Sequence, residues 1–161
     1  MDPPIRTPAE ILAFRSLRQI LAGKPRALWS VGPADSVLAA VQMMADHDIG
    51  CVAVLEADKL VGIVSERDCA RRVLLAKKPP ETTRISEIMV RNVVTADPSH
   101  TFADCLRLMH QHGIRHLPVI ENGKVTTVIS IRDLLSEAVT HHAKIISELE
   151  RERLTIFTST A

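Results

Sequence analysis

The chain has 161 residues, a formal net charge of +1, 46% hydrophobic residues and 24% charged residues, which is an ordinary globular composition. The even charge balance argues against a protein that mainly binds duplex nucleic acid, and the 2% aromatic content leaves few rings for stacking single-stranded bases. No apolar run approaches the length of a membrane span, and the acidic, proline-rich start is unlike a secretory signal, so we expect a cytoplasmic protein.

The N-terminal segment, residues 1–26, is predicted to be helical. Thr7-Pro8-Ala9-Glu10 combines an N-cap, a proline in the first turn and a capping-box acid, which is typical of a helix start. Apolar residues then recur at helical spacing, and Gly23 marks the expected end of the helix. These apolar residues are Ile11, Phe14, Leu17 and Leu21.

Residues 27–78 are predicted to form a β-α-β-β-α unit. The expected elements are an extended piece at Trp29–Val31, a helix from about Ser36 to His47, strands at Cys51–Leu55 and Leu60–Val64, and a helix that follows Ser65 and ends in Lys77-Lys78. Ser36 is a favourable N-cap for the first helix. Pro79-Pro80 stops the second helix and opens a linker over residues 79–84.

Residues 85–138 are predicted to repeat this order. The expected elements are an extended piece at Val93–Thr95, a helix over Thr101–His112, strands at His116–Ile120 and Val125–Ile129, and a helix after Ser130. Glu121-Asn122-Gly123 is a hairpin signal between the two strands.

Residues 139–161 are predicted to continue as a C-terminal helix and tail. Leu135, Val139, Ile145, Ile146 and Leu149 form an apolar stripe along this helix. The stripe needs a partner, which is either the body of the same chain or a second copy.

An internal repeat supports this division. A shift of 65 positions places residues 31–73 on residues 96–138 without a gap, and ten aligned pairs are identical. The pairs are Pro33/Pro98, Met44/Met109, His47/His112, Ile49/Ile114, Val54/Val119, Glu56/Glu121, Lys59/Lys124, Ser65/Ser130, Arg67/Arg132 and Asp68/Asp133. The sequence therefore predicts a mixed α/β (α+β) chain in which two small repeats with mixed sheets pack as a pair.

The two repeats resemble the cystathionine-β-synthase (CBS) domain, which occurs as tandem pairs. The matching segments in the first repeat are residues 48–54 (DIGCVAV) and 62–68 (GIVSERD), and in the second repeat residues 113–119 (GIRHLPV) and 128–133 (VISIRD). Residues 85–89 (ISEIM) also look like the leading segment of a second copy. The resemblance covers about Ala27 to Ala138. The whole chain resembles small bacterial proteins that consist of little beyond a CBS pair.

The resemblance implies a cleft between the repeats that binds AMP, ADP or ATP, with NAD as a further candidate and S-adenosylmethionine as a less favoured one. It also implies a disc-shaped homodimer. The family's Ser/Thr-x-x-Asp signature maps onto Ser65/Asp68 and Ser130/Asp133, where it contacts ribose hydroxyls. Two positions depart from the family pattern, because Thr127 replaces the glycine present as Gly62, and Ala53 replaces the proline present as Pro118.

The Ser-x-Arg-Asp motifs have two readings. A serine followed three residues later by an acid is a helix capping box that needs no ligand. An ionised aspartate at that place can also accept two ribose hydroxyls. Because aspartate is short for a capping box and the motif recurs in both repeats, we favour ligand contact by Asp68 and Asp133, with the serines serving both roles.

Other side chains are candidates for the remaining parts of the ligand. Arg115 and His116 are expected to face the phosphates, the alternative being a solvated start of a strand. Arg67 and Arg132 lie in helix first turns, where a cation opposes the dipole, and this suggests an anion nearby. The base is expected between apolar walls and backbone groups. The walls include Ile63, Val64, Val128 and Ile129, the backbone groups lie near Cys51 and His116, and Met89 completes the candidate set.

The two sites are expected to differ. Gly62 should leave room beside Asp68, whereas the side chain of Thr127 should narrow the pocket beside Asp133. We therefore expect the site at Asp68 to bind its ligand with the higher affinity.

No metal site or catalytic centre is predicted. Cys51, Cys69 and Cys105 are widely spaced with no Cys-x-x-Cys pair, and Gly113 should separate His110 and His112 from His116. We find no nucleophile with a base, no paired carboxylates and no familiar glycine-rich phosphate loop, so we do not expect an enzyme.

Two hypotheses about function follow. The favoured one is a regulatory module that binds an adenosine-containing nucleotide and signals to a separate partner protein that remains to be identified. The alternative is an interaction or scaffold protein that keeps the CBS fold without a ligand and uses the C-terminal helix as its contact.

Overall fold

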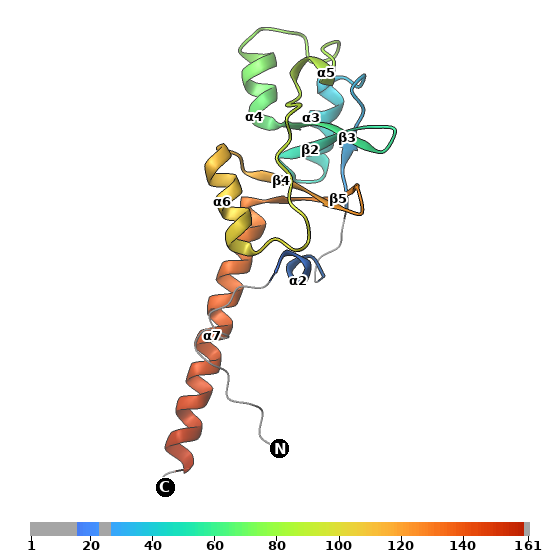
Figure 1. Ribbon diagram of the computed structural model, residues 1–161. Helices are drawn as coiled ribbons and strands as arrows, with labels where there is room; N and C mark the ends of the chain where they lie inside the picture. Colours follow the sequence, from blue (N-terminus) through green and yellow to red (C-terminus); the bar gives the residue numbers. More distant parts are fainter. Residues whose placement is uncertain (1–15, 23–26, 160–161) are drawn as a thin grey trace.

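The computed structural model describes residues 16–22 and 27–159, with side chains up to Arg151. The predicted helix start at Thr7 and the predicted stop at Gly23 lie outside the described residues. Within the described part, the first repeat lies above the second, and the long C-terminal helix projects away from both (Figure 1).

The first repeat has the predicted order of elements. It contains β1 (Ser30–Val31), α3 (Val37–Asp46), β2 (Cys51–Glu56), β3 (Lys59–Ser65) and α4 (Glu66–Cys69). Strand β1 pairs in parallel with β2, and β2 pairs antiparallel with β3. The Ser36 side chain caps α3 by accepting a hydrogen bond from the amide of Ala39. This sheet confirms the predicted mixed α/β class.

The second repeat has a smaller sheet. It contains α6 (Phe102–His112), β4 (His116–Glu121), β5 (Lys124–Ser130) and α7 (Ile131–Ser159), and β4 pairs antiparallel with β5. Both hairpins turn through two residues with positive φ, Ala57 and Asp58 in the first repeat and Asn122 and Gly123 in the second. This geometry fits the right-handed twist of paired strands, and it explains why Asn-Gly was a hairpin signal.

The piece predicted to be extended at Val93–Thr95 does not form a strand. Only Ala96 pairs with β4, in an isolated parallel bridge to Val119. The amide of Ala53 donates to the carbonyl of Trp29 at 3.2 Å in the first repeat, but its counterpart Pro118 has no amide hydrogen to donate. The proline therefore removes the hydrogen bond that would extend the pairing to Val94.

The second helix of the first repeat ends earlier than predicted. After α4 the chain forms a π-helical turn, η1 (Ala70–Leu74), in which the amide of Leu75 donates to the carbonyl of Ala70 at 3.0 Å. Lys77 then adopts a φ of 53°, so Lys77-Lys78 forms a turn and not the end of a helix. In the second repeat the corresponding chain continues as the 29-residue helix α7.

Each repeat completes its core with a short helix from outside its own span. Helix α2 (Leu17–Ala22) docks on the second repeat, where the amide of Leu17 donates to the carbonyl of His100 at 2.9 Å. Helix α5 (Ile85–Ile88) docks on the first repeat, where the amide of Ile85 donates to the carbonyl of Asp35 at 2.9 Å. Residues 85–89, predicted within the second repeat, therefore belong to the core of the first.

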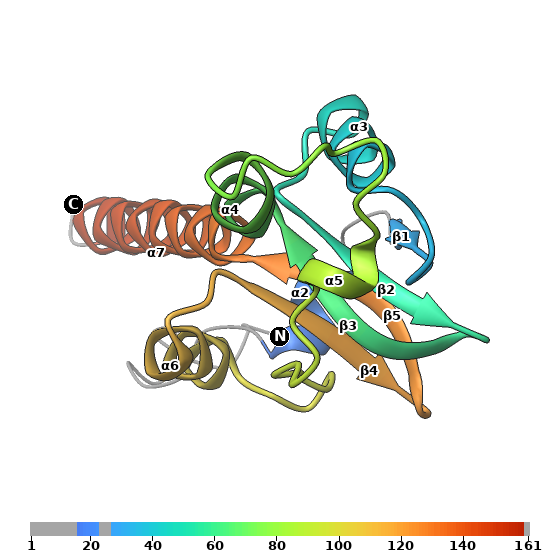
Figure 2. The same cartoon turned by 90° about the horizontal axis from the view of Figure 1, so that it is seen from above.

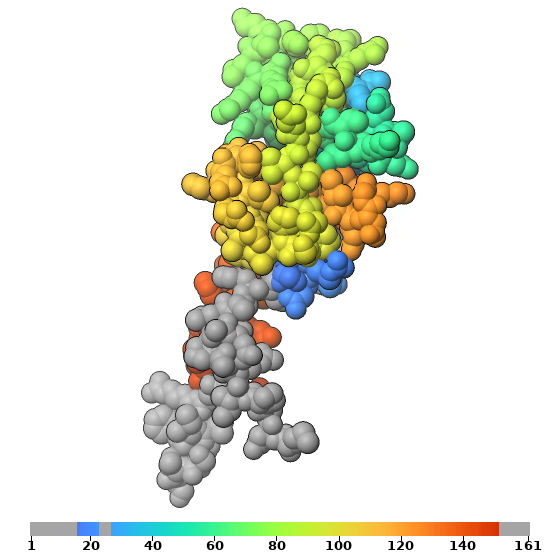
Figure 3. Space-filling model, viewed as in Figure 1, coloured from blue at the N-terminus to red at the C-terminus, as the bar shows by residue number. Residues whose placement is uncertain are grey.

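The chain between α5 and α6 joins the two units. In Figure 3 it crosses the visible face as a yellow-green strip from the first repeat to the second. Figure 2 shows the strands of both sheets in the middle of the molecule, with α3 and α4 on one side and α6 on the other. The junction between the sheets is where the candidate site lies.

Glycine at position 62 is required by the docking of α5. A β-carbon placed on Gly62 would lie 2.7 Å from Sδ and 3.2 Å from Cβ of the buried Met89, whereas one on Gly32 would meet only Asp35 at 3.5 Å. Val90 also pairs with Ile63 at this point, so the segment cannot move away without breaking two hydrogen bonds.

We expect Gly62→Ala to lower the free energy of unfolding by about 1–3 kcal/mol, because the added methyl overpacks the contact with Met89. Urea denaturation monitored by circular dichroism measures this loss. Gly32→Ala is the matched control and should change stability by less than about 0.5 kcal/mol. Combining Gly62→Ala with Met89→Ala should cost less than the sum of the two single changes. A Gly62→Ala protein as stable as the control would contradict the steric explanation.

Candidate functional site

Two cavities lie at the junction of the repeats. The large cavity has a volume of about 620 Å³, and its walls include Ser130–Asp133 of the second repeat and Asp48–Cys51 of the first. The small cavity has a volume of about 180 Å³, and its walls include Ser65–Asp68 of the first repeat and Gly113–His116 of the second. Each cavity therefore combines the motif of one repeat with the strand start of the other.

The two cavities share a central wall. Gly50, Cys51, Glu66, Arg115 and His116 line both of them. Gly50 and Cys51 occupy the same positions in the first repeat as Arg115 and His116 in the second. The shared wall of the two cavities therefore combines an uncharged pair from one repeat with a basic pair from the other. A β-carbon on Gly50 would lie 3.4 Å from Nε2 of His116, which shows how closely the two strand starts approach.

Twelve of the predicted residues line these cavities. The predicted residues that line the large cavity are Cys51, Arg115, His116, Val128, Ile129, Ser130, Arg132 and Asp133. In addition to the shared residues, the small cavity is lined by Ile63, Ser65, Arg67 and Asp68. Val64 and Met89 line neither cavity. Val64 is fully buried on the inner face of β3, and Met89 fills the space beside Gly62.

Both Ser-x-Arg-Asp motifs form complete capping boxes. Oδ2 of Asp68 accepts hydrogen bonds from the Ser65 amide at 3.0 Å and from the Ser65 hydroxyl at 2.6 Å. Oδ2 of Asp133 accepts the same two bonds from Ser130, both at 2.8 Å. The expectation that aspartate is too short for this box is wrong, because the extended backbone of the N-cap brings its amide within reach. Capping by itself therefore does not identify a ligand site.

A third capping box supports this conclusion. Thr101 and Asp104 make the same contacts at the start of α6, and neither residue lines either of the two cavities. What distinguishes Asp68 and Asp133 from Asp104 is their position at the junction between the repeats.

His116 occupies the centre of the junction. It is half-buried, and burial is the main reason that the pKa of its imidazole is lowered, with Arg115 and Arg67 acting in the same direction and Asp133 opposing them. The neutral form of this histidine is therefore favoured in the folded protein.

The sizes of the cavities reverse one expectation. Gly62 does not leave room for a ligand, because Met89 already fills the space beside it. Thr127 does not close the pocket beside Asp133, because it lies in the wall of the larger cavity with 8% of its surface exposed. The more spacious site is thus at Asp133 and not at Asp68.

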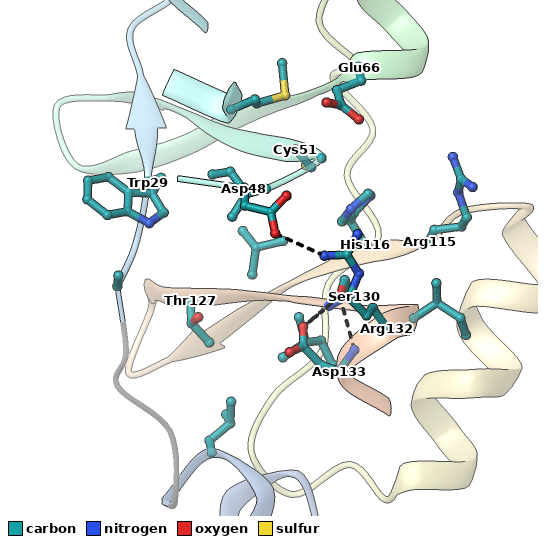
Figure 4. A pocket seen from close by; sticks show the side chains of 18 of the residues that line it. Trp29, Asp48, Cys51, Glu66, Arg115, His116, Thr127, Ser130, Arg132 and Asp133 are labelled. Atoms are coloured by element: carbon teal, nitrogen blue, oxygen red, sulfur yellow. Dashed lines mark hydrogen bonds and ion pairs between the residues drawn. The ribbon is translucent and has the colours of Figure 1, made fainter. Parts of the chain in front are cut away.

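Sequence reasoning missed part of the large cavity. Trp29 lines it and stacks on His47 with ring centroids 3.4 Å apart, and Ile20 and Leu21 of α2 form one end. Asp48 also lines it and pairs with Arg132 across the repeats, with Oδ2 of Asp48 3.6 Å from Nη1 of Arg132 (Figure 4). Asp48 aligns with Gly113, and this alignment indicated a left-handed backbone at Asp48. The ion pair with Arg132 had no such signal, because the two residues lie far apart in sequence.

The cysteines and histidines do not assemble into a metal centre in the described part of the chain, where no three potential ligands cluster. Cys51, Cys69 and Cys105 are buried. Burial raises the pKa of the Cys51 thiol far above its usual range and the pKa values of Cys69 and Cys105 to about 11. These thiols are therefore held in the unreactive protonated form.

Comparison with known proteins identifies the repeats. The sequence model described as CBS domain matches residues 26–75 and 85–140. YhcV, a CBS domain-containing protein of Bacillus subtilis, is 30% identical over 105 residues, or 65% of this chain and 74% of its own length. For two further curated relatives the match spans 58% and 54% of their length. A putative signal-transduction protein with CBS domains from Burkholderia ambifaria has a solved structure with a TM-score of 0.76 at 39% identity, covering 78% of this chain and 95% of that one.

Other solved neighbours carry ligands or form assemblies. One CBS domain pair, in complex with 5′-methylthioadenosine and S-adenosyl-L-methionine, has a TM-score of 0.68 over 76% of this chain and 94% of that one, and at 23% identity it shows the fold alone. A hexameric CBS-CP12 protein from bloom-forming cyanobacteria is 27% identical, with a TM-score of 0.67 over 77% and 72% of the two chains. Hypoxic Response Protein I, with two coordinated zinc ions, is 25% identical, with a TM-score of 0.63 over 76% and 98%.

Among the described residues, no helix combines the length and the apolar character that a membrane span requires.

The lowered pKa of His116 predicts a pH dependence of stability. The unfolded imidazole has a pKa of about 6.5 and takes up a proton before the folded one does as the pH falls. The stability that this residue contributes is therefore complete above about pH 6.5 and is lost as the pH falls toward the folded-state pKa. Urea midpoints measured between pH 8 and pH 5.5 should decline less steeply in His116→Gln than in the parent. His110→Gln, which changes an exposed histidine, should keep the parent slope. Equal slopes in all three proteins would contradict the assignment.

Proposed function

The chain belongs to the CBS-domain family, and from this we propose that it is a regulatory module that binds an adenosine-containing nucleotide in the large cavity between its repeats. One observation carries the proposal, namely that Ser130–Asp133 and Arg115 converge on a cavity of about 620 Å³ at the junction. This volume lies within the usual range of about 300–1,000 Å³ for small-molecule sites, whereas the 180 Å³ of the small cavity lies below it.

The ribose is assigned to Asp133. An ionised carboxylate offers about four acceptor positions, and the capping box uses two of them, so capping and ligand contact are compatible. Two adjacent ribose hydroxyls can donate to such a group, and charge-assisted bonds of this kind are the strong ones. The strand and helix that meet at Ser130 hold the carboxylate in place before a ligand arrives.

Phosphates are assigned to the arginines at the opening. Arg115 and Arg132 are both exposed and reach the large cavity from different elements, Arg115 from the segment before β4 and Arg132 from the start of α7. Guanidinium groups suit phosphate because they donate two parallel hydrogen bonds. The adenine is assigned to the apolar part of the wall, where Ile49, Val128 and Ile129 lie beside backbone groups of Gly50 and Cys51.

Signalling is assigned to the junction itself. A ligand that contacts both repeats stabilises one arrangement of the repeats relative to others. A separate protein that binds this arrangement preferentially then responds to the ligand. We place no catalytic step in the site, in line with the regulatory character of CBS domains. The complex of a related CBS pair with two adenosyl compounds supports an adenosine ligand for this fold.

The proposal predicts that AMP, ATP or NAD at millimolar concentration raises the melting temperature of dialysed protein, because a ligand that binds only the folded state stabilises it. Asp133→Asn should weaken binding by roughly tenfold or more, since hydrogen bonds to a charged group are worth about 1.5–3 kcal/mol. Asp104→Asn alters the same type of capping box away from the cavities and is the matched control. It should keep the ligand response.

Differential scanning fluorimetry followed by calorimetric titration provides both measurements. A parent protein that responds to none of the three nucleotides would favour the alternative of a ligand-free scaffold. Equal responses from guanosine or cytidine nucleotides would contradict adenosine selectivity.

A homodimer is proposed from the surface of α7. Leu135, Val139, Ile146 and Leu149 are 57%, 70%, 57% and 51% exposed and follow the spacing of a coiled-coil seam. CBS-pair neighbours form oligomers, including a hexamer. A second copy of α7 would cover this stripe.

Removal of residues 140–161 should convert a dimer to monomers or reduce solubility, because it deletes Ile146 and Leu149, which are half of the exposed seam. Ile146→Glu should act in the same direction, and Ser147→Glu, a charge at the neighbouring exposed position, should not. Sedimentation at about 10 µM, on the scale of ordinary dimer affinities, measures the oligomeric state. A monodisperse full-length monomer at that concentration would rule the dimer out.

A further inference from the structure

Asp48 is a charged residue of the large cavity that neither the repeat nor the assigned ligand contacts explain. It lies in the turn before β2, where its carboxylate faces the start of α7 from the opposite repeat. Its Oδ2 is 3.6 Å from Nη1 of Arg132, which is one of the two arginines assigned to phosphate (Figure 4). A negative charge thus stands at the place where phosphates would arrive.

The small cavity has no carboxylate at the corresponding place, although Glu66 lines both cavities. The counterpart of Asp48 is Gly113, and the counterpart of Arg132 is Arg67, which has no carboxylate within 4.0 Å among residues 16–22 and 27–151. Both turn residues have left-handed backbone, with φ of 49° at Asp48 and 61° at Gly113. Glycine adopts this conformation at no cost, so the aspartate is not there for the sake of the turn.

A structural role for the Asp48–Arg132 pair is also small. The two side chains are 96% and 80% exposed, and ion pairs so open to solvent contribute little to stability. The effect of the carboxylate is instead on a charged ligand. Each phosphate beyond the first adds negative charge near Asp48 and must also compete with it for Arg132.

We propose that Asp48 determines ligand specificity in the large cavity, where it favours a nucleoside monophosphate over the corresponding di- and triphosphate. This inference rests on the proposed function, since it concerns the same site. The two neighbouring charges act in opposite directions. Arg132 attracts the first phosphate, and Asp48 repels the second and third.

The test is calorimetric titration of AMP and ATP into the parent, Asp48→Asn and Asp58→Asn, without magnesium and at low salt. Asparagine keeps the size of the side chain and tolerates the left-handed backbone. Asp58 also has a positive φ, of 62°, but lies in the β2–β3 hairpin and lines neither cavity, so its variant is the matched control. In Asp48→Asn the affinity for ATP should rise relative to AMP by about five- to tenfold, the scale of one screened charge interaction. The gain should shrink as salt is added.

The outcomes separate the two proposals. If all three proteins bind AMP and the ratio of ATP to AMP affinity is the same in each, Asp48 has no role in specificity and the proposed function stands. If the ratio changes equally in Asp58→Asn, the effect comes from net charge and the inference is overturned. If none of the proteins binds either nucleotide, the inference fails, and the proposed function fails with it when NAD also does not bind.

Discussion

The crossed docking of two short helices holds the molecule together. Helix α2 precedes the first repeat in sequence but inserts Leu17, Ile20 and Leu21 into the core of the second. Helix α5 opens the second repeat in sequence, but Ile85, Ile88 and the adjoining Met89 pack into the core of the first. Because each core needs side chains from outside its own span, neither repeat can bury its apolar face alone. The two units are thereby fixed against each other, and the cavities form where they meet.

This arrangement makes two similar repeats into two unlike sites. The 65-residue repeat places a Ser-x-Arg-Asp motif beside each cavity, but the surroundings of the two motifs differ. Met89 fills the space beside Gly62 on the buried face of β3, and Val90 pairs with Ile63. The motif of the first repeat lies beside only about 180 Å³. The motif of the second repeat faces about 620 Å³ and has Asp48 across the junction. Position, and not the identity of the motif, decides which copy has room for a ligand.

The capping boxes explain why the motif alone was ambiguous. Asp68, Asp133 and Asp104 make the same hydrogen bonds to the residue that caps their helix, yet only the first two line the cavities at the junction. A cap is a local interaction over three residues, so sequence predicts it equally well in all three places. Whether the same carboxylate also faces a ligand depends on what the rest of the chain places opposite it.

The sequence by itself determined the repeat, the order of strands and helices, the hairpins, the caps and the family, because these depend on residues close to one another in the chain. It also identified Ser130, Asp133, Arg115 and His116 as residues of the candidate site. Only the tertiary structure decided that residues 85–89 belong to the other repeat's core, that Val64 and Met89 are buried away from the cavities, and that Asp48 meets Arg132. These facts depend on contacts between segments far apart in sequence, and in a chain with two similar halves the local pattern cannot say which half a given segment joins.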